Sequence, residues 1–122
     1  MAATAITKTV VTRNAATAVP AAATVAKTDG ALVTFDKDDQ KILLLLKNAI
    51  TNVTHTAVIK KGNGLQGVSD LEITIEPSAE VVTVIESGRF MDVSNNNKGK
   101  VNIVSKDTTT GTQIEVRAIV LP

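Results

Sequence analysis

The sequence contains no cysteine, no tryptophan and no tyrosine, and its aromatic content of 2% comes from Phe35 and Phe90 alone. Without cysteine, neither a disulfide framework nor a thiolate metal site can form. Proteins that bind single-stranded nucleic acid stack the bases on aromatic faces, and sugar-binding sites use such faces as well. The composition therefore argues against nucleic acid and carbohydrate as ligands.

An excess of charge of one sign is also missing, because the formal net charge is +1. The chain thus produces no strong field that would attract nucleic acid. The longest aliphatic run, Ile42–Leu46, is far shorter than the roughly 20 residues that span a bilayer. One histidine and no cysteine or tyrosine leave few general acids or bases. We therefore expect neither a membrane helix nor an enzyme.

The chain is instead rich in Val, Ile, Leu, Ala and Thr, and its 122 residues suit one domain. Enrichment in β-branched residues favours strands. Short alternating segments separated by turn residues predict an all-β antiparallel β-sandwich, either immunoglobulin-like or jelly-roll-like. Within it, 41–47 is expected to be a central strand buried on both faces, although the leucines of 38–49 also favour a helix. The expected strands are 31–35, 41–47, 53–60, 68–76, 81–86, 89–93, 100–105 and 113–121.

The first 28 residues differ in composition from the rest. They are rich in Ala and Thr, contain basic but no acidic residues, and share these features with organelle transit peptides. We interpret 1–28 as an extended N-terminal arm and 29–122 as the sandwich domain. Residues 5–12 and 22–26 are expected to form short strands within the arm. On this interpretation, deletion of the arm leaves the sandwich folded.

Three short patterns suggest a ligand and fail on inspection. Residues 62–67 match G-x-G-x-x-G, but a strand rather than a helix follows, so the phosphate cradle of a dinucleotide site is missing. The acidic turn 36–39 lacks the glycine and glutamate of a calcium loop. His55 alternates with Val53, Ala57 and Ile59, which predicts a core position rather than a catalytic one. We expect no catalytic residues, no cofactor and no metal.

Several segments of the second part of the chain resemble small structural proteins of tailed bacteriophages that decorate the capsid. The resemblance implies a sandwich-type module that sits on the outer shell and binds the major capsid protein, often as a homo-oligomer or at capsomer junctions. It implies no catalytic residues, and it does not include the N-terminal arm. The segments that carry it are Lys41–Asn48, Ala57–Ile75, Val84–Phe90, Asn97–Ile103 and Val116–Pro122.

The sequence thus predicts a virion structural protein, a decoration or cement protein, that binds and reinforces the outer capsid surface through its arm and loops. The expected partner is the major capsid protein, self-association is left open, and no nucleic acid, membrane or small-molecule substrate is expected. The expected location is the virion surface, after a period in the host cytoplasm during assembly. The candidate interaction residues are Ile6, Val10, Val11, Arg13 and Val19 in the arm, and Asn63, Leu65, Gln66, Asn96 and Lys98 in two loops.

Two other functions fit the same features. A component of the phage tail or of the head–tail connector would use sheet edges to assemble into rings. A secreted adhesin or carbohydrate-binding module would use the loops, but the missing aromatic residues and the missing secretory signal argue against it.

Overall fold

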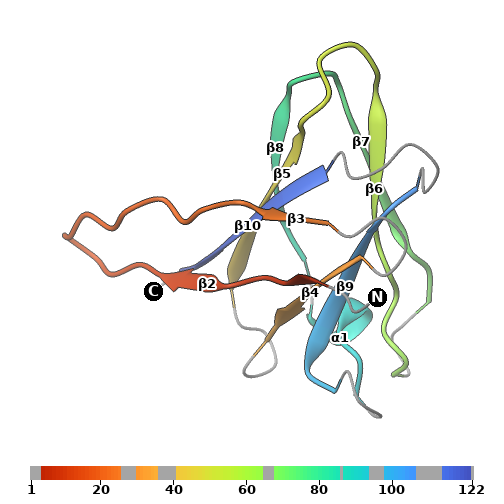
Figure 1. Ribbon diagram of the computed structural model, residues 1–122. Coiled ribbons are helices and arrows are strands. Elements are labelled where there is room, and N and C mark those ends of the chain that lie inside the picture. The colour runs from red at the N-terminus through yellow and green to blue at the C-terminus, as the bar shows by residue number, and fades with distance from the viewer. Residues whose placement is uncertain are drawn as a thin grey trace.

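The computed structural model describes residues 4–25, 30–35, 41–64, 68–85, 87–93, 98–106 and 114–121. The protein is an all-β sandwich in which two five-stranded sheets pack face to face (Figure 1). The order in sheet A is β1 (Thr4–Ala5), β4 (Ala31–Thr34), β9 (Lys100–Ser105), β6 (His55–Ile59) and β7 (Leu71–Ile75). The order in sheet B is β2 (Lys8–Val10), β10 (Ile114–Val120), β5 (Ile42–Asn48) and β8 (Glu80–Val84), with β3 (Ala23–Thr24) also paired to β10.

The two sheets are mixed and not purely antiparallel, which corrects one part of the predicted fold. Strand β1 runs parallel to β4, and β2 runs parallel to β10, whereas the other strand pairs are antiparallel. Antiparallel neighbours are usually joined by tight hairpins, and parallel neighbours need long connections. The N-terminal strands reach their neighbours only through long connections, so they can enter at the sheet edges in either direction.

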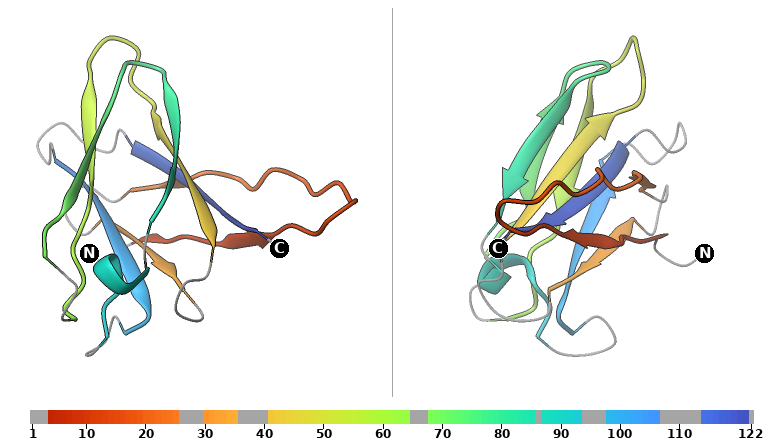
Figure 2. Two further views of the ribbon diagram at one scale, coloured as in Figure 1. Left: turned by 180° about the vertical axis from the view of Figure 1, so that it is seen from behind. Right: turned by 90° about the vertical axis from the view of Figure 1, so that its left-hand side faces the viewer.

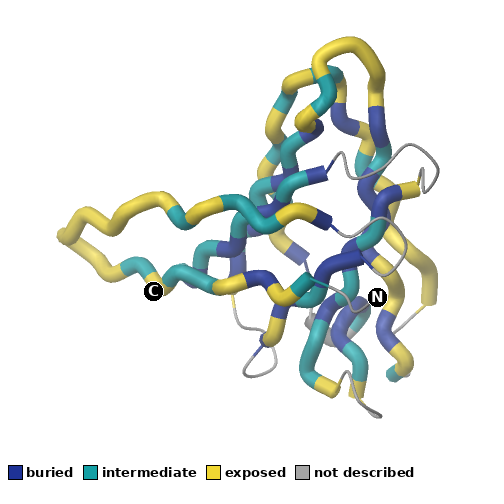
Figure 3. The backbone as a smooth tube through the Cα atoms, in the orientation of Figure 1, coloured by how far each residue is buried: buried dark blue, intermediate teal, exposed yellow. Residues whose placement is uncertain are grey.

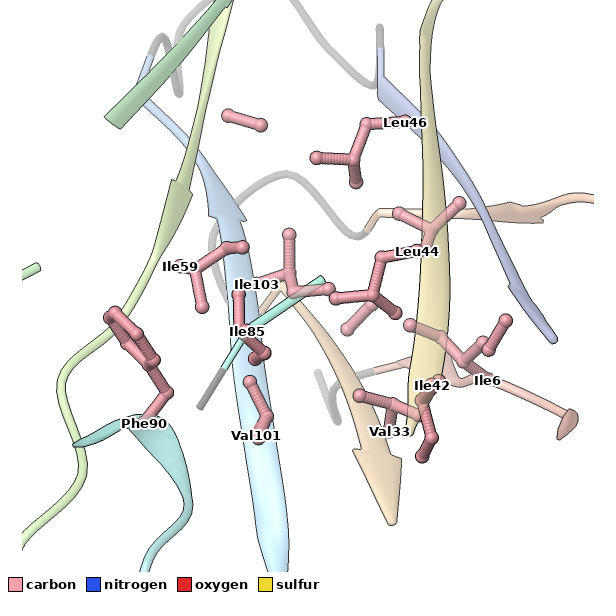
Figure 4. Packing of buried hydrophobic residues seen from close by; sticks show 14 of the residues in the cluster. Ile6, Val33, Ile42, Leu44, Leu46, Ile59, Ile85, Phe90, Val101 and Ile103 are labelled. Atoms are coloured by element: carbon pink, nitrogen blue, oxygen red, sulfur yellow. The ribbon is translucent and has the colours of Figure 1, made fainter. Parts of the chain in front are cut away.

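The core lies between the sheets and follows the alternation of the strands. In β5 the side chains of Ile42, Leu44 and Leu46 are buried, and those between them are half-buried. Figure 4 shows Leu44 pointing from β5 towards Ile103 of β9, and the core is closed at one end by Phe90. Strand β5 is therefore central as predicted, but the expectation that both of its faces are buried is wrong. A two-layer fold covers only one face of each sheet.

The N-terminal segment is built into both sheets. The amides of Thr4 and Ile6 donate to the carbonyls of Gly30 and Leu32 at 3.0 and 2.9 Å, and the amide of Val25 donates to that of Ile114 at 2.9 Å. The side chains of Ile6 and Val25 belong to the core, with exposures of 7% and 0%. Deletion of this segment would remove core residues and uncover two sheet edges. The expectation that its deletion leaves the sandwich folded is therefore replaced by an expected loss of stability.

Only the middle of this segment leaves the sandwich. Residues 11–22 form a long loop between β2 and β3 that projects from sheet B, and 12–19 are exposed throughout (Figures 1 and 3). Asn14 adopts the left-handed backbone conformation, with φ of 59°, at a turn in this loop. We call residues 11–22 the projecting loop. The predicted boundary between arm and sandwich, at residues 28 and 29, falls outside the described residues.

The segment expected as a strand over 89–93 is different in the structure. Ser87–Phe90 form a single helical turn, α1, and Met91 follows with an isolated bridge to Val101 of β9. The turn places Phe90 in the core, where its side chain is 4% exposed. The helical turn takes up Arg89 and Phe90, so extended backbone begins only at Met91, which forms a single bridge instead of a strand.

A candidate protein-binding face on sheet B

The outward face of sheet B carries a strip of apolar side chains across three strands. The pairing places Leu43 of β5 between Val84 of β8 and Ile119 of β10, and places Leu45 opposite Val82. Val82 and Val84 are 58% and 57% exposed, and the other three side chains are half-buried. These five residues, Leu43, Leu45, Val82, Val84 and Ile119, form what we call the sheet B strip. Contiguous apolar surface that includes exposed side chains is a candidate binding surface.

The outward face of sheet A has a different character. Among the residues that the structure describes, this face has no exposed large apolar side chain. The hydroxyl groups of Thr56 and Thr74 lie 3.5 Å apart across β6 and β7, and Lys106 forms an ion pair with Glu72 at 3.1 Å. Polar and charged groups of this kind remain hydrated on a free surface. The outward face of sheet A also has apolar side chains, Leu32, Val58 and Val104, but they are half-buried or buried. The two faces therefore differ in the exposed side chains of Val82 and Val84 on sheet B.

Arg117 connects the sheet B strip to the projecting loop. On β10 it lies opposite Leu45, and its Nε donates to the carbonyl of Pro20 at 3.0 Å. Its Nη1 lies 2.9 Å from Oε2 of Glu80 on β8. Glu80 is paired with Lys47, so this ion pair crosses β5 beside the apolar strip. The guanidinium group thereby holds the base of the loop against the sheet and gives the strip a polar border.

The projecting loop stands beside the strip. Its two legs leave the edge formed by β2 and β3 and extend away from the sandwich (left panel of Figure 2). Its start is held by the amide of Val11, which donates to the carbonyl of Val120 at 3.1 Å. Val19 is 72% exposed, and Arg13 is exposed near the turn. The loop that projects from sheet B therefore carries an exposed apolar and an exposed basic side chain.

The candidate residues of the arm fall into two groups. Val10, Arg13 and Val19 are exposed on or next to the projecting loop, and Val11 is half-buried at its start. Arg13 and Val19 thus lie on the loop that projects from sheet B, with Val11 at its start, whereas Val10 pairs with the inward-facing Val120 and lies on the opposite face of sheet B from the strip. Ile6 is a correction, because its side chain is buried in the core and stabilises the fold instead of facing a partner.

The candidate residues of the two loops lie elsewhere. Asn63 is exposed, and its Oδ1 accepts a hydrogen bond from the amide of Val93 at 2.7 Å, while Lys98 is exposed in the turn before β9. This places 62–64 beside 91–93, at an end of the sandwich that lies away from the projecting loop (Figure 1). Leu65, Gln66 and Asn96 lie outside the described residues. The described residues of these two loops are therefore not part of the sheet B face.

His55 has the core position that its sequence pattern predicts. It is 6% exposed and lies opposite Ile75 in the pairing of β6 with β7. A shallow cavity of about 260 Å³ adjoins it and is lined by Val53, Thr54, Thr56 and Lys106. Over the ranges that the structure describes, no group of three or more His, Cys, Asp or Glu side chains gathers into a metal-binding arrangement. No described helix is long and apolar enough to cross a membrane.

One carboxyl group has a perturbed acidity. The amide of Lys61 donates to Oδ1 of Asp70 at 2.8 Å, and Nζ of Lys60 lies 3.2 Å from Oδ2. The Lys61 hydrogen bond, together with the hydrogen bond and charge of Lys60, holds the pKa of Asp70 below its ordinary value, although burial acts in the opposite direction. These groups close the connection between β6 and β7, and they stabilise that connection without forming a ligand site.

The sheet B strip is the feature that the sequence analysis missed. Its signal was present in Ile42–Leu46, where apolar residues fill positions on both faces of one strand. In a two-layer sandwich, one face of every strand points outward, so a strand that is apolar on both faces must place leucines at the surface. Interpreting this run as a doubly buried strand concealed that consequence.

Comparison with known proteins gives no match, because no family model, no curated protein and no solved structure is significantly similar to this chain. The assignment to a family of phage capsid proteins thus stays a prediction from the residues. The functional argument rests on the geometry of sheet B.

Proposed function

We propose that this chain is a virion structural protein that binds and reinforces the outer surface of a phage capsid. Its partner is the major capsid protein, and its binding surface consists of the sheet B strip and the projecting loop. The protein acts by binding and not by catalysis. In this proposal its sandwich belongs to the immunoglobulin-like or jelly-roll-like class, as expected from its sequence. The observation that carries the proposal is the exposed apolar strip on one sheet only.

The composition of this surface fits a protein partner. Protein interfaces have an apolar centre with a polar border, and here Arg117, Glu80 and Lys47 border the valines and leucines of the strip. The projecting loop adds an exposed chain that can lie along a neighbouring subunit. Many copies on a lattice of identical subunits gain strength from repeated contacts even where each contact is weak. A shell protein that binds only the assembled state also stabilises that state.

The test is co-sedimentation of the purified protein with particles that lack it. We expect saturable binding at a fixed ratio to shell subunits. Val84→Lys places a charge at an exposed position of the strip and should weaken binding by about tenfold or more. The matched control is Thr74→Lys, which adds the same charge at an exposed position on the outward face of sheet A. Equal binding of both variants and the unaltered protein would refute the role of sheet B.

The projecting loop requires a separate variant, because deletion of the whole N-terminal segment would damage the core. Strand β2 ends beside Val120 of β10 and β3 begins beside Val116, about 13 Å apart along that strand. A Gly/Ser linker of about six residues can span this distance. Replacing 12–20 by such a linker should preserve the fold and weaken particle binding.

The same experiment separates the other two functions. Absence of binding together with a closed ring in free solution would favour a tail or connector component. Absence of binding together with a monomer would favour the adhesin. In either case the capsid proposal fails.

A further inference from the structure

Strand β8 ends sheet B and presents hydrogen-bonding groups on its free side. The amide of Asn48 donates to the carbonyl of Ala79 at 3.0 Å, so this facing pair of β5 and β8 is hydrogen-bonded. In an antiparallel ladder, bonded and non-bonded pairs alternate. The backbone groups of Val81 and Thr83 therefore point to β5, and those of Glu80, Val82 and Val84 point away from it. In the described part of the chain, no strand lies beyond β8.

This edge lacks the protection that the other edges have. Natural sheets block their edges with short strands, charged side chains or irregular backbone. At the edges of sheet A, strand β1 has only two residues, and β7 has the charged residues Asp70 and Glu72 at its start. In sheet B, the edge made by β2 and β3 is interrupted by the projecting loop. Strand β8 has one charged residue, Glu80, and Arg117 draws its carboxylate across β5. Four uncharged residues, Val81–Val84, follow it.

We propose that two copies of this chain associate edge to edge through β8, as an antiparallel pair with a two-fold axis at Val82. The free backbone groups allow only registers in which Glu80, Val82 and Val84 face one another, and the register centred on Val82 is the one that pairs all three residues of each copy. Val82 faces Val82 of the second copy, and Glu80 faces Val84 of the second copy, so that each of these residues exchanges hydrogen bonds with its counterpart. Any shift by one residue would bring groups that already bond to β5 opposite the free ones.

The charges of the edge agree with this register. The Glu80 carboxylates of the two copies lie about 13 Å apart along the strand direction, which exceeds the screening length of about 8 Å at physiological salt. Strand β8 has a free edge, and in this register its charge does not repel that of the second copy. The two β8 strands can therefore pair without help from another protein. The paired sheets also join their two sheet B strips into one wider apolar surface.

Cysteine substitution tests this register, because the chain has no cysteine of its own. In Val82→Cys the two thiols face each other across the two-fold axis, at a Cα separation of about 5.5 Å that a disulfide tolerates. The matched control is Val84→Cys, an almost equally exposed position on the same strand, where the two thiols lie about 13 Å apart. Under mild oxidation of the protein alone, Val82→Cys should form covalent dimers about tenfold faster or more, since pairing raises the effective concentration of its thiols.

Equal rates for the two variants, or a faster rate for Val84→Cys, would overturn the proposal. A second measurement needs no substitution. Hydrogen exchange of the Val82 and Val84 amides in the unaltered protein should slow as the protein concentration rises, because pairing removes them from water. Exchange that is independent of concentration would mean that the edge stays free, and the proposal would fail. Both tests use the protein without particles, so their outcome is separate from that of the capsid-binding test.

Discussion

The N-terminal segment contains two valines that separate its structural role from its binding role. Val25 is 0% exposed and lies in the core beside β10, whereas Val19 is 72% exposed in the projecting loop. Val25→Ala and Val19→Ala remove the same atoms from the same segment. We expect the first to destabilise the fold and the second to leave the stability unchanged.

The magnitude follows from burial. Removing two methylene equivalents from a buried valine costs about 1.6 kcal/mol in transfer free energy. The space left behind adds about 1 kcal/mol where the surroundings cannot close it. The free energy of unfolding should thus fall by about 2–3 kcal/mol, which for a chain of this length lowers Tm by about 8–12 °C. An exposed valine changes the free energy of unfolding by less than about 0.5 kcal/mol.

The measurement is urea or thermal unfolding followed by far-UV circular dichroism, because a chain without Trp and Tyr offers little intrinsic fluorescence. The slope of the unfolding free energy against urea should be the same for Val25→Ala and Val19→Ala, so that a shift of the midpoint reports stability alone. Equal midpoints for the two variants would refute the placement of the N-terminal segment in the core.

Two further predictions concern the backbone and the projecting loop. Gly30→Ala should cost more than about 3 kcal/mol of stability, because a Cβ there would collide with a β9 carbonyl. Gly99→Ala has a similar positive φ, but its Cβ would make only an ordinary van der Waals contact with the carbonyl of Phe35, so it should cost about 1–2 kcal/mol. Chemical denaturation compares the two variants, and equal losses would contradict the crowding argument. Arg117→Met should release the base of the projecting loop, because it removes the hydrogen bond to Pro20 and the ion pair with Glu80. Trypsin should then cleave faster after Arg13, and the stability should fall by about 1 kcal/mol. An unchanged cleavage rate would show that Arg117 does not hold the loop.

Local patterns in the sequence were enough to predict the class of fold and most of its strands. Alternation over 71–75 and 114–120 places every second residue on one face, and turn formers separate these runs, so the strands are determined before any contact is made. The run Ile42–Leu46 shows the limit of such reasoning. These residues fit a strand with one buried face as well as a strand with both faces buried.

The N-terminal segment shows the same limit in another way. Its Ala- and Thr-rich composition indicates neither a sheet partner nor a direction, and the core positions of Ile6 and Val25 depend on residues that lie far away in the sequence. The four arm residues Val10, Val11, Arg13 and Val19 were recognised as candidates, but their place on or next to a loop that projects from sheet B could not be derived from their spacing.

The sequence by itself determined that the chain forms strands, that it can hold no disulfide, and that its core is aliphatic. These properties depend on side-chain shape and on alternation along the chain, which act over a few residues. The tertiary structure decided which face of β5 is covered, where the N-terminal strands pair, and that β8 remains an edge. Each of those depends on which distant segments pack together, because only such contacts determine whether an apolar side chain or a backbone amide is buried or remains at the surface.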